Sequence, residues 1–191
     1  MRAAVVVRPE VPGNTGFIAR LCENFDFSLR VVEPGFNLEK ARKTASSAQE
    51  SLRNAEIFDT VEDAVDDLDY VVGTKPGRGV EIDGLEPRNN TSVMIGPESS
   101  GLSNEELELC DSVVHIETGE YDSLNQSHAA AIVMHRLRDT SEVGMEEGQK
   151  QQLEQLLDSD LLEELLLRAN PSRGEMDRLL GDLHRLAHDS T

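Results

Sequence analysis

The sequence has few lysines and no long apolar run. Only four of its 191 residues are lysine, and it contains no stretch of 18 apolar residues, so we expect no membrane-spanning helix. The apolar stretch near its start, residues 3–7, is too short for a signal peptide and has no cleavage site after it. We therefore expect a cytoplasmic protein.

Cysteines and metal-ligand clusters are also scarce. Cys22 and Cys110 are too few for a disulfide framework and lack the spacing of metal ligands, which predicts two free thiols. His184 and His188 lie four residues apart in an acidic segment, a pattern more typical of a solvated helix face than of a metal site. We expect no metal.

Acidic residues are abundant, and the formal net charge is −19. RNA-binding proteins are ordinarily basic, so this charge alone argues against a nucleic-acid partner. The carboxylates are spread along the whole chain, however, as in proteins built for molar salt, where the Debye length is only about 3 Å. We infer a halophilic source, which weakens the objection to an RNA substrate.

Apolar runs and helical patterns alternate as far as residue 138. Helical spacing predicts helices at 13–25, 39–54, 60–67 and 124–137, with Thr60 as a cap and a capping box at residues 103–106. Residues 75–90 are rich in glycine and proline, which predicts a loop. Strands are expected at 5–7, 29–32, 70–73, 93–95 and 113–116. This alternation predicts an α/β domain with a mostly parallel sheet.

The composition changes after Arg138. We expect a domain over residues 1–139, a polar linker over 140–148, and a small helical C-terminal extension over 149–191 whose leucines recur at helical spacing.

Common nucleotide-binding and hydrolase motifs are absent. The turn after the first strand does not match G-x-G-x-x-G, no G-x-x-x-x-G-K-[ST] occurs, and no G-x-S-x-G elbow supplies a nucleophile.

Three other segments directly follow predicted strands, where open α/β sheets bind ligands. They are residues 14–20 (NTGFIAR), 96–102 (GPESSGL) and 122–132 (DSLNQSHAAAI). Each has a structural alternative: Asn14 could cap a helix, Arg20 could be a solvated helix residue, and Ser123 with Gln126 fits a capping pattern.

Together, in this order, the segments resemble the motifs N-x-G-x-x-x-R, G-x-E-x-x-G-L and S-L-N-x-S of the SpoU/TrmH branch of the SPOUT-class methyltransferases. The resemblance covers about residues 3 to 138 and is strongest to the TrmJ-type tRNA 2′-O-methyltransferases. It implies a trefoil-knotted C-terminal half, a homodimer, and S-adenosyl-L-methionine (SAM) bound at the knot. The cofactor residues that it implies are Thr74, Lys75, Pro76, Gly96, Glu98, Gly101, Ile116, Asp122, Ser123, Leu124 and Asn125.

The same resemblance implies catalytic roles for Arg20, Asn14, Ser123 and Asn125. Similar enzymes are often said to use the arginine as a general base, but a guanidinium is always protonated. We prefer Arg20 as a bidentate clamp on the target phosphate, with Asn14 and Asn125 holding neighbouring groups in register. Glu98 is expected to support its loop rather than to transfer protons.

The resemblance points to tRNA as the partner and to nucleotide 32, on cytidine, as the first choice. Pro97 stands where many TrmJ-type enzymes carry arginine, and Gly-Pro-Glu occurs in relatives that modify position 34. Position 34 or an rRNA ribose is therefore the runner-up. A non-catalytic RNA-binding or assembly protein, or an acidic interaction module that uses the leucine-striped tail, are the rivals from other classes.

Overall fold

The computed structural model describes residues 2–46, 48–86, 88, 90–120, 124–138, 179, 180 and 185. The chain divides into two compact units, residues 1–86 with 90–138, and residues 87–89 with 139–191. Apart from residues 179, 180 and 185, which are helical, the predicted linker and extension lie outside the described residues, as do His184 and His188. Within the described part, no helix is long and apolar enough to cross a membrane.

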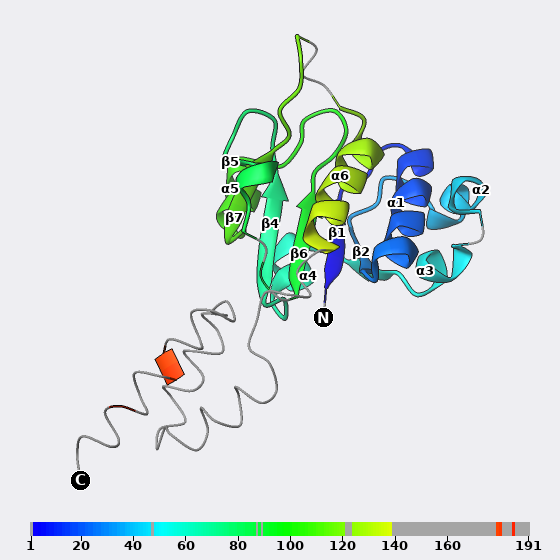
Figure 1. Ribbon diagram of the computed structural model, residues 1–191. Helices are drawn as coiled ribbons and strands as arrows, with labels where there is room; N and C mark the ends of the chain where they lie inside the picture. The colour runs from blue at the N-terminus through cyan, green and yellow to red at the C-terminus, as the bar shows by residue number, and fades with distance from the viewer. Residues whose placement is uncertain are drawn as a thin grey trace. The chain divides into compact units, whose positions relative to one another are not determined.

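The first unit is built on a seven-stranded sheet with the order β3-β2-β1-β6-β4-β7-β5 (Figure 1). Every neighbouring pair is parallel, which confirms the predicted parallel sheet. The strands are β1 (Ala3–Val7), β2 (Ser28–Val32), β3 (Glu56–Phe58), β4 (Tyr70–Thr74), β5 (Val80–Glu81), β6 (Thr91–Ile95) and β7 (Ser112–His115).

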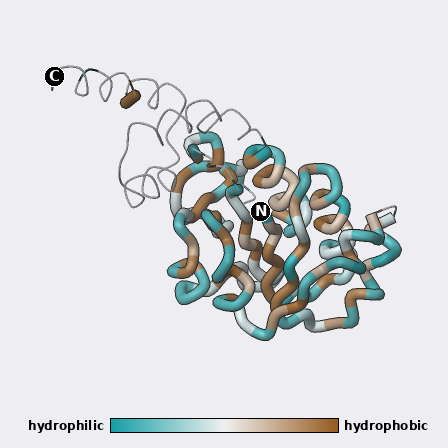
Figure 2. The backbone as a smooth tube through the Cα atoms, turned by 90° about the horizontal axis from the view of Figure 1, so that it is seen from below, coloured by the Kyte–Doolittle hydropathy of each residue, from teal (hydrophilic) through white to brown (hydrophobic). Residues whose placement is uncertain are grey.

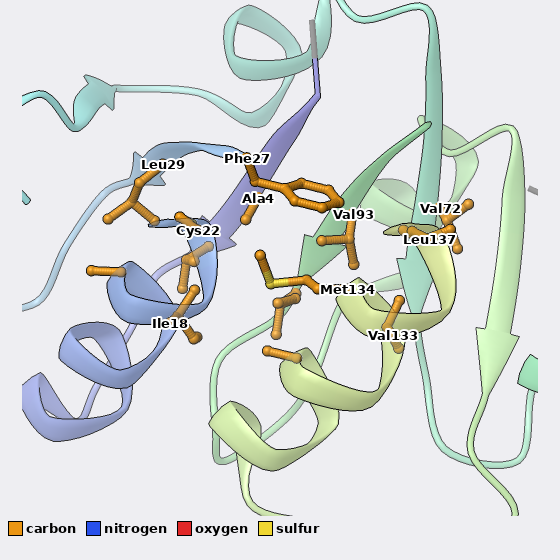
Figure 3. Close-up of a cluster of buried hydrophobic side chains, with 14 of the residues drawn as sticks. Ala4, Ile18, Cys22, Phe27, Leu29, Val72, Val93, Val133, Met134 and Leu137 are labelled. Atoms are coloured by element: carbon orange, nitrogen blue, oxygen red, sulfur yellow. The ribbon is translucent and has the colours of Figure 1, made fainter. Parts of the chain in front are cut away.

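Helices cover both faces of the sheet, so the inner strands β1 and β6 are buried on both sides. Ala4 and Val6 of β1 pack in one cluster with residues of α1 (Pro12–Phe25) and α6 (Gln126–Arg138), shown in Figure 3. Ala3 and Val5 pack in a second cluster on the opposite face, with residues of α4 (Val61–Val65) and α5 (Asn104–Glu108) among others. This two-sided burial explains the unbroken apolar run at residues 3–7, and Figure 2 shows hydrophobic residues gathered along the inner strands.

Both predicted caps are confirmed. The Thr60 hydroxyl accepts a hydrogen bond from Asp63 N at the start of α4. Ser103 and Glu106 form the reciprocal capping box of α5. These local signals therefore located the beginnings of two helices correctly.

The single helix predicted over residues 39–54 is wrong. The structure has a 3₁₀ turn η1 (Leu38–Ala41), then α2 (Arg42–Ala45) and α3 (Gln49–Arg53). α2 ends at Ser46, whose φ of 54° is not helical. A Cβ on Gly16 would lie 2.3 Å from the Ala41 carbonyl oxygen, so α1 packs directly on this backbone. That tertiary contact is invisible to helical periodicity.

Two further boundaries differ from prediction. Residues 75–90 were expected to be a loop, but they include β5 and a 3₁₀ turn η2 (Ile82–Gly84) in which Ile82 is buried. Gly79 makes this possible, because its φ is +82° and a Cβ there would clash with the Val113 carbonyl. α6 begins at Gln126 rather than at Leu124.

Candidate functional site

Three neighbouring strands, β6, β4 and β7, end at the same edge of the sheet. Gly73 of β4 pairs with Met94 of β6 on one side and with Val113 of β7 on the other. The loops that follow these strands therefore emerge side by side. Thr74 is the last residue of β4, and the loops contain the other predicted cofactor residues of this region, Lys75, Pro76, Gly96, Glu98, Gly101 and Ile116. The structure thus brings together residues that are far apart in the sequence.

Lys75 joins the loop after β4 to the loop after β6, and two glycines shape the second of these loops. The Lys75 ammonium donates to the Ser100 carbonyl (3.0 Å) and to the Leu102 carbonyl (2.7 Å). A Cβ on Gly96 would lie 2.3 Å from Gly101 C and from Leu102 N, and Gly101 has a φ of +65°. The backbone of residues 101–102 therefore passes directly against residue 96, at a distance that only glycine permits.

Glu98 binds the turn that precedes α1. Its carboxylate accepts hydrogen bonds from Glu10 N (2.9 Å), Val11 N (3.2 Å) and Asn14 Nδ2 (3.0 Å). The Glu10 carboxylate accepts in return from Ser99 N (3.0 Å) and Ser99 Oγ (2.6 Å). This reciprocal pairing agrees with a supporting role for Glu98. Glu10 was missed from sequence because no motif or spacing marks it.

A chain of hydrogen bonds continues from Glu98 to α6. Asn125 Nδ2 donates to Asn14 Oδ1 (3.1 Å), and Asn125 Oδ1 accepts from Ser127 N (2.9 Å) and Ser127 Oγ (2.7 Å). Glu98, Asn14 and Asn125 come from the three different sequence motifs. All three motifs therefore meet in one network at the carboxyl edge of the sheet.

The same contacts decide two structural alternatives. Val11, not Asn14, precedes the first residue of α1, and Asn14 is a buried residue inside the helix. Asn125 rather than Ser123 caps α6, because α6 begins at Gln126 and Asn125 accepts from Ser127 N. Asp122 and Ser123 lie outside the described residues. Leu124 is exposed next to Asn125.

Gln126 ties the start of α6 to the loop after β6. Its Nε2 donates to the Gly96 carbonyl (2.8 Å), which fixes the orientation of the amide. Its Oε1 is buried and has no hydrogen-bond partner in the described part of the chain. A buried acceptor therefore lies unpaired beside Gly96.

Arg20 stands apart from this network. It is exposed on α1 and lines a hollow of about 230 Å³ together with Phe17, Asn24, Ser127 and His128. It makes no hydrogen bond or ion pair with the residues that the structure describes. The larger hollow, about 470 Å³, is lined by residues such as Arg2 and Ser28 at the start of β2, and contains none of the predicted site residues.

Neither cysteine of the chain is suited to act as a nucleophile. Burial raises the pKa of Cys22 and of Cys110 to about 12, so neither thiol ionises near neutral pH. Both are free, as predicted from the sequence. Among the residues that the structure describes, no three or more His, Cys, Asp or Glu side chains are grouped so that they could hold a metal ion.

The fold is shared with a solved methyltransferase structure. The structure of the SpoU methyltransferase AviRb from Streptomyces viridochromogenes in complex with the cofactor AdoMet superposes with a TM-score of 0.63 and 24% identity, over 71% of this chain and 56% of AviRb. That likeness establishes the fold.

The sequence matches the SpoU rRNA Methylase family over residues 1–135, and the chain belongs to that family. It is 33% identical to the tRNA (cytidine-2'-O-)-methyltransferase TrmJ of Methanocaldococcus jannaschii, over 82% of this chain and 78% of that protein. It is 32% identical to the tRNA (cytidine/uridine/adenosine-2'-O-)-methyltransferase TrmJ of Pseudomonas aeruginosa, over 70% of this chain but only 59% of that protein. The resemblance inferred from the three motifs is confirmed.

Proposed function

We propose that this chain transfers a methyl group from SAM to a ribose 2′-hydroxyl of tRNA, at nucleotide 32 and on cytidine. The single observation that carries the proposal is the hydrogen-bond network Glu98–Asn14–Asn125, which joins all three motifs at the ligand-binding edge of the sheet.

The reaction class and the cofactor rest on the family. The chain is an RNA 2′-O-methyltransferase, and SAM is the methyl donor that such enzymes use. The M. jannaschii relative is named for cytidine and the P. aeruginosa relative for cytidine, uridine and adenosine. Cytidine is therefore our first choice because both names include it.

The loops at the strand ends fit a ligand that is bound largely through backbone groups. Gly96 and Gly101 let main-chain segments lie in direct contact there, and the unpaired Oε1 of Gln126 offers a buried acceptor beside Gly96. Thr74, Lys75, Pro76, Ile116 and the segment 122–125 would complete the site. SAM would supply an electrophilic methyl group there, and the chain's own residues would align the ribose with it.

Arg20 is assigned to the substrate rather than to the cofactor. A guanidinium presents a planar fork of N–H donors, so Arg20 clamps a phosphate by two hydrogen bonds and thereby orients the 2′-hydroxyl. Asn14, Asn125 and Ser123 hold the neighbouring groups in register. Because Arg20 makes no hydrogen bond or ion pair with the described residues of the strand-end loops, we assign it to the site of a partner subunit in a homodimer.

The exposed apolar residues support that dimer. Phe17 on α1 and Ile132 on α6 are 43% and 41% exposed, and the two helices pack against each other. A shared α1–α6 interface would bury both side chains. Light scattering in molar KCl tests the assembly, and a mass near 21.1 kDa, that of one chain, would contradict it.

The trefoil knot expected from the resemblance is also part of the proposal. Such a knot needs neighbouring loops packed together, and Lys75, in the loop after β4, donates to the carbonyls of Ser100 and Leu102 in the loop after β6. Calorimetry of SAM binding with and without EDTA tests the metal-free cofactor site. Loss of binding in EDTA would contradict it.

The function itself is tested by incubating unmodified tRNA with labelled SAM and mapping the methylated nucleotide. The expected result is label at nucleotide 32, abolished when that nucleotide already carries a 2′-O-methyl group. Label at position 34 would favour the runner-up suggested by Gly96-Pro97-Glu98, and label only in rRNA would replace tRNA as the substrate. SAM binding without methylation of either RNA would favour a non-catalytic RNA-binding protein.

A further inference from the structure

Most cations in the described part of the chain are bonded to protein groups. Lys75 donates to two carbonyls, Arg8 pairs with Glu106, and Arg30 pairs with Asp67. In the same described ranges, four cations make no hydrogen bond, ion pair or ring contact. They are Arg20, Lys40, Lys43 and Arg53.

These four residues, which we call the cationic corner, occupy adjacent elements. Arg20 is on α1, Lys40 and Lys43 are on the continuous turn η1–α2, and Arg53 is at the end of α3. α1 packs against η1, α2 and α3, and Figure 1 shows these helices gathered beside one another. Lys40 and Lys43 are three residues apart, so their side chains share a helix face.

The local charge has the opposite sign to that of the whole protein. Residues 37–53 contain four cations against two carboxylates, Glu39 and Glu50, whereas the chain carries a net charge of −19. Including α1 adds Arg20 and Glu23, which leaves the excess unchanged. All four residues of the cationic corner are exposed. A polyanion that the rest of the protein repels therefore meets an attractive field here.

We propose that the cationic corner binds the phosphate backbone of the RNA substrate. The inference rests on the proposed function, because Arg20, assigned there to a substrate phosphate, is part of the corner. Lys40 and Lys43 extend the positive surface beyond Arg20 and act as point charges, which suit phosphates without reading sequence. RNA is favoured over an acidic protein because the elements that carry the other three cations pack against α1, which carries Arg20 of the proposed methylation site.

The first experiment removes two charges. The variant Lys40→Gln/Lys43→Gln is compared with Lys40→Arg/Lys43→Arg and with the unmodified protein by measuring the Kd for tRNA across a KCl series. We expect the glutamine variant to bind on the order of tenfold more weakly near about 0.1 M KCl, with a salt slope smaller by about 2. The arginine variant keeps both charges and should bind normally. SAM affinity and the thermal midpoint should not change in either variant.

The second experiment removes one carboxylate from α3, the helix that ends in Arg53 of the cationic corner, and one from α4, which carries no residue of the corner. Glu50→Gln and Glu62→Gln make the same chemical change in the first turn of α3 and α4 respectively, and both glutamates are exposed. We expect tighter tRNA binding for Glu50→Gln alone. Equal tightening in both variants would show that net charge acts and would overturn the proposal.

The two experiments separate this inference from the proposed function. Normal tRNA binding by Lys40→Gln/Lys43→Gln, in a protein that methylates tRNA, overturns the cationic corner only. If the unmodified protein neither binds nor methylates tRNA, both proposals fail. Binding of the corner to an acidic protein with no loss of tRNA affinity in the glutamine variant would also overturn it.

Discussion

The strand-end loops and the cationic corner differ in whether their charged side chains are bonded to other groups of the chain. At the strand-end loops, Lys75, Glu98 and Glu10 are each bonded to two or more groups of the chain. In the cationic corner, Arg20, Lys40 and Lys43 have no partner among the described residues. Internal bonds preorganise a site before its ligand arrives, whereas unpaired cations await a counter-charge. The first region suits a small cofactor and the second a polyanion.

The largest expected effect comes from breaking the first region at Gly96. Gly96→Ala would place a methyl group 2.3 Å from the backbone of residues 101–102, so residue 96 and residues 101–102 must move apart. We expect a loss of about 2 kcal/mol or more in the free energy of unfolding, and no measurable SAM binding. Urea unfolding and calorimetry measure both. The matched control is Gly84→Ala, where nothing lies within 4 Å of the new Cβ. Equal stability and equal SAM binding in the two variants would contradict the close packing of residue 96 on residues 101–102.

Arg20 tests whether the second region needs geometry as well as charge. Arg20→Ala and Arg20→Lys should both lower methylation by at least about 100-fold, because lysine keeps the charge but loses the planar fork that aligns the phosphate. SAM affinity should be nearly unchanged in both variants, since Arg20 makes no hydrogen bond or ion pair with the described residues of the strand-end loops. Methylation retained by Arg20→Lys would show that a positive charge alone suffices.

The sequence predicted the strand-end region better than the elements around the cationic corner, and the reason is physical. Apolar runs buried on both faces located β1, β2, β4, β6 and β7, and side-chain caps located α4 and α5. The prediction of one helix over residues 39–54 is wrong because Gly16 lets α1 pack on the backbone of residue 41, a contact between residues distant in the sequence. The motifs indicated Asn14, Glu98 and Asn125, but their mutual hydrogen bonds, and the part played by Glu10, depend on strand order and could not be derived from spacing.

Salt should stabilise the fold but weaken the phosphate contacts of the cationic corner. With a net charge of −19, self-repulsion destabilises the fold at low ionic strength, so the thermal midpoint and the methylation rate should rise with KCl. Phosphate contacts weaken with salt, and the four unpaired cations of the described residues would contribute at most about −4 to the slope of log affinity against log salt. The measurement runs from about 0.1 to about 3 M KCl, over which the Debye length falls from about 10 Å to below about 3 Å. A protein most stable and most active at the low end would refute the halophilic interpretation.

The smallest expected effect concerns an ion pair that anchors the strand-end region without contacting a ligand. Glu106 is 7% exposed, pairs with Arg8 at the end of β1, and accepts a hydrogen bond from Ser103 N (2.7 Å) in the capping box. Burial alone would raise the pKa of Glu106, but the hydrogen bonds from Arg8 and from Ser103 N outweigh it and leave that pKa below its ordinary value. A lowered carboxyl pKa stabilises the fold above the unfolded-state pKa of about 4.3, and this stabilisation is lost as pH falls through the folded-state pKa.

Glu106→Gln should therefore cost about 1 kcal/mol of unfolding free energy at pH 7, a modest figure because Arg8 is partly exposed to solvent. The difference from the unmodified protein should shrink below about pH 4, because protonation then removes the same charge from Glu106. Urea unfolding at a series of pH values measures it, with Glu108→Gln, an exposed residue of the same helix, as the matched control. A stability difference for Glu106→Gln that stays constant from pH 7 to acid would mean that the side chain acts by packing and not by its charge. The strand-end region would then owe that part of its order to shape rather than to an ion pair.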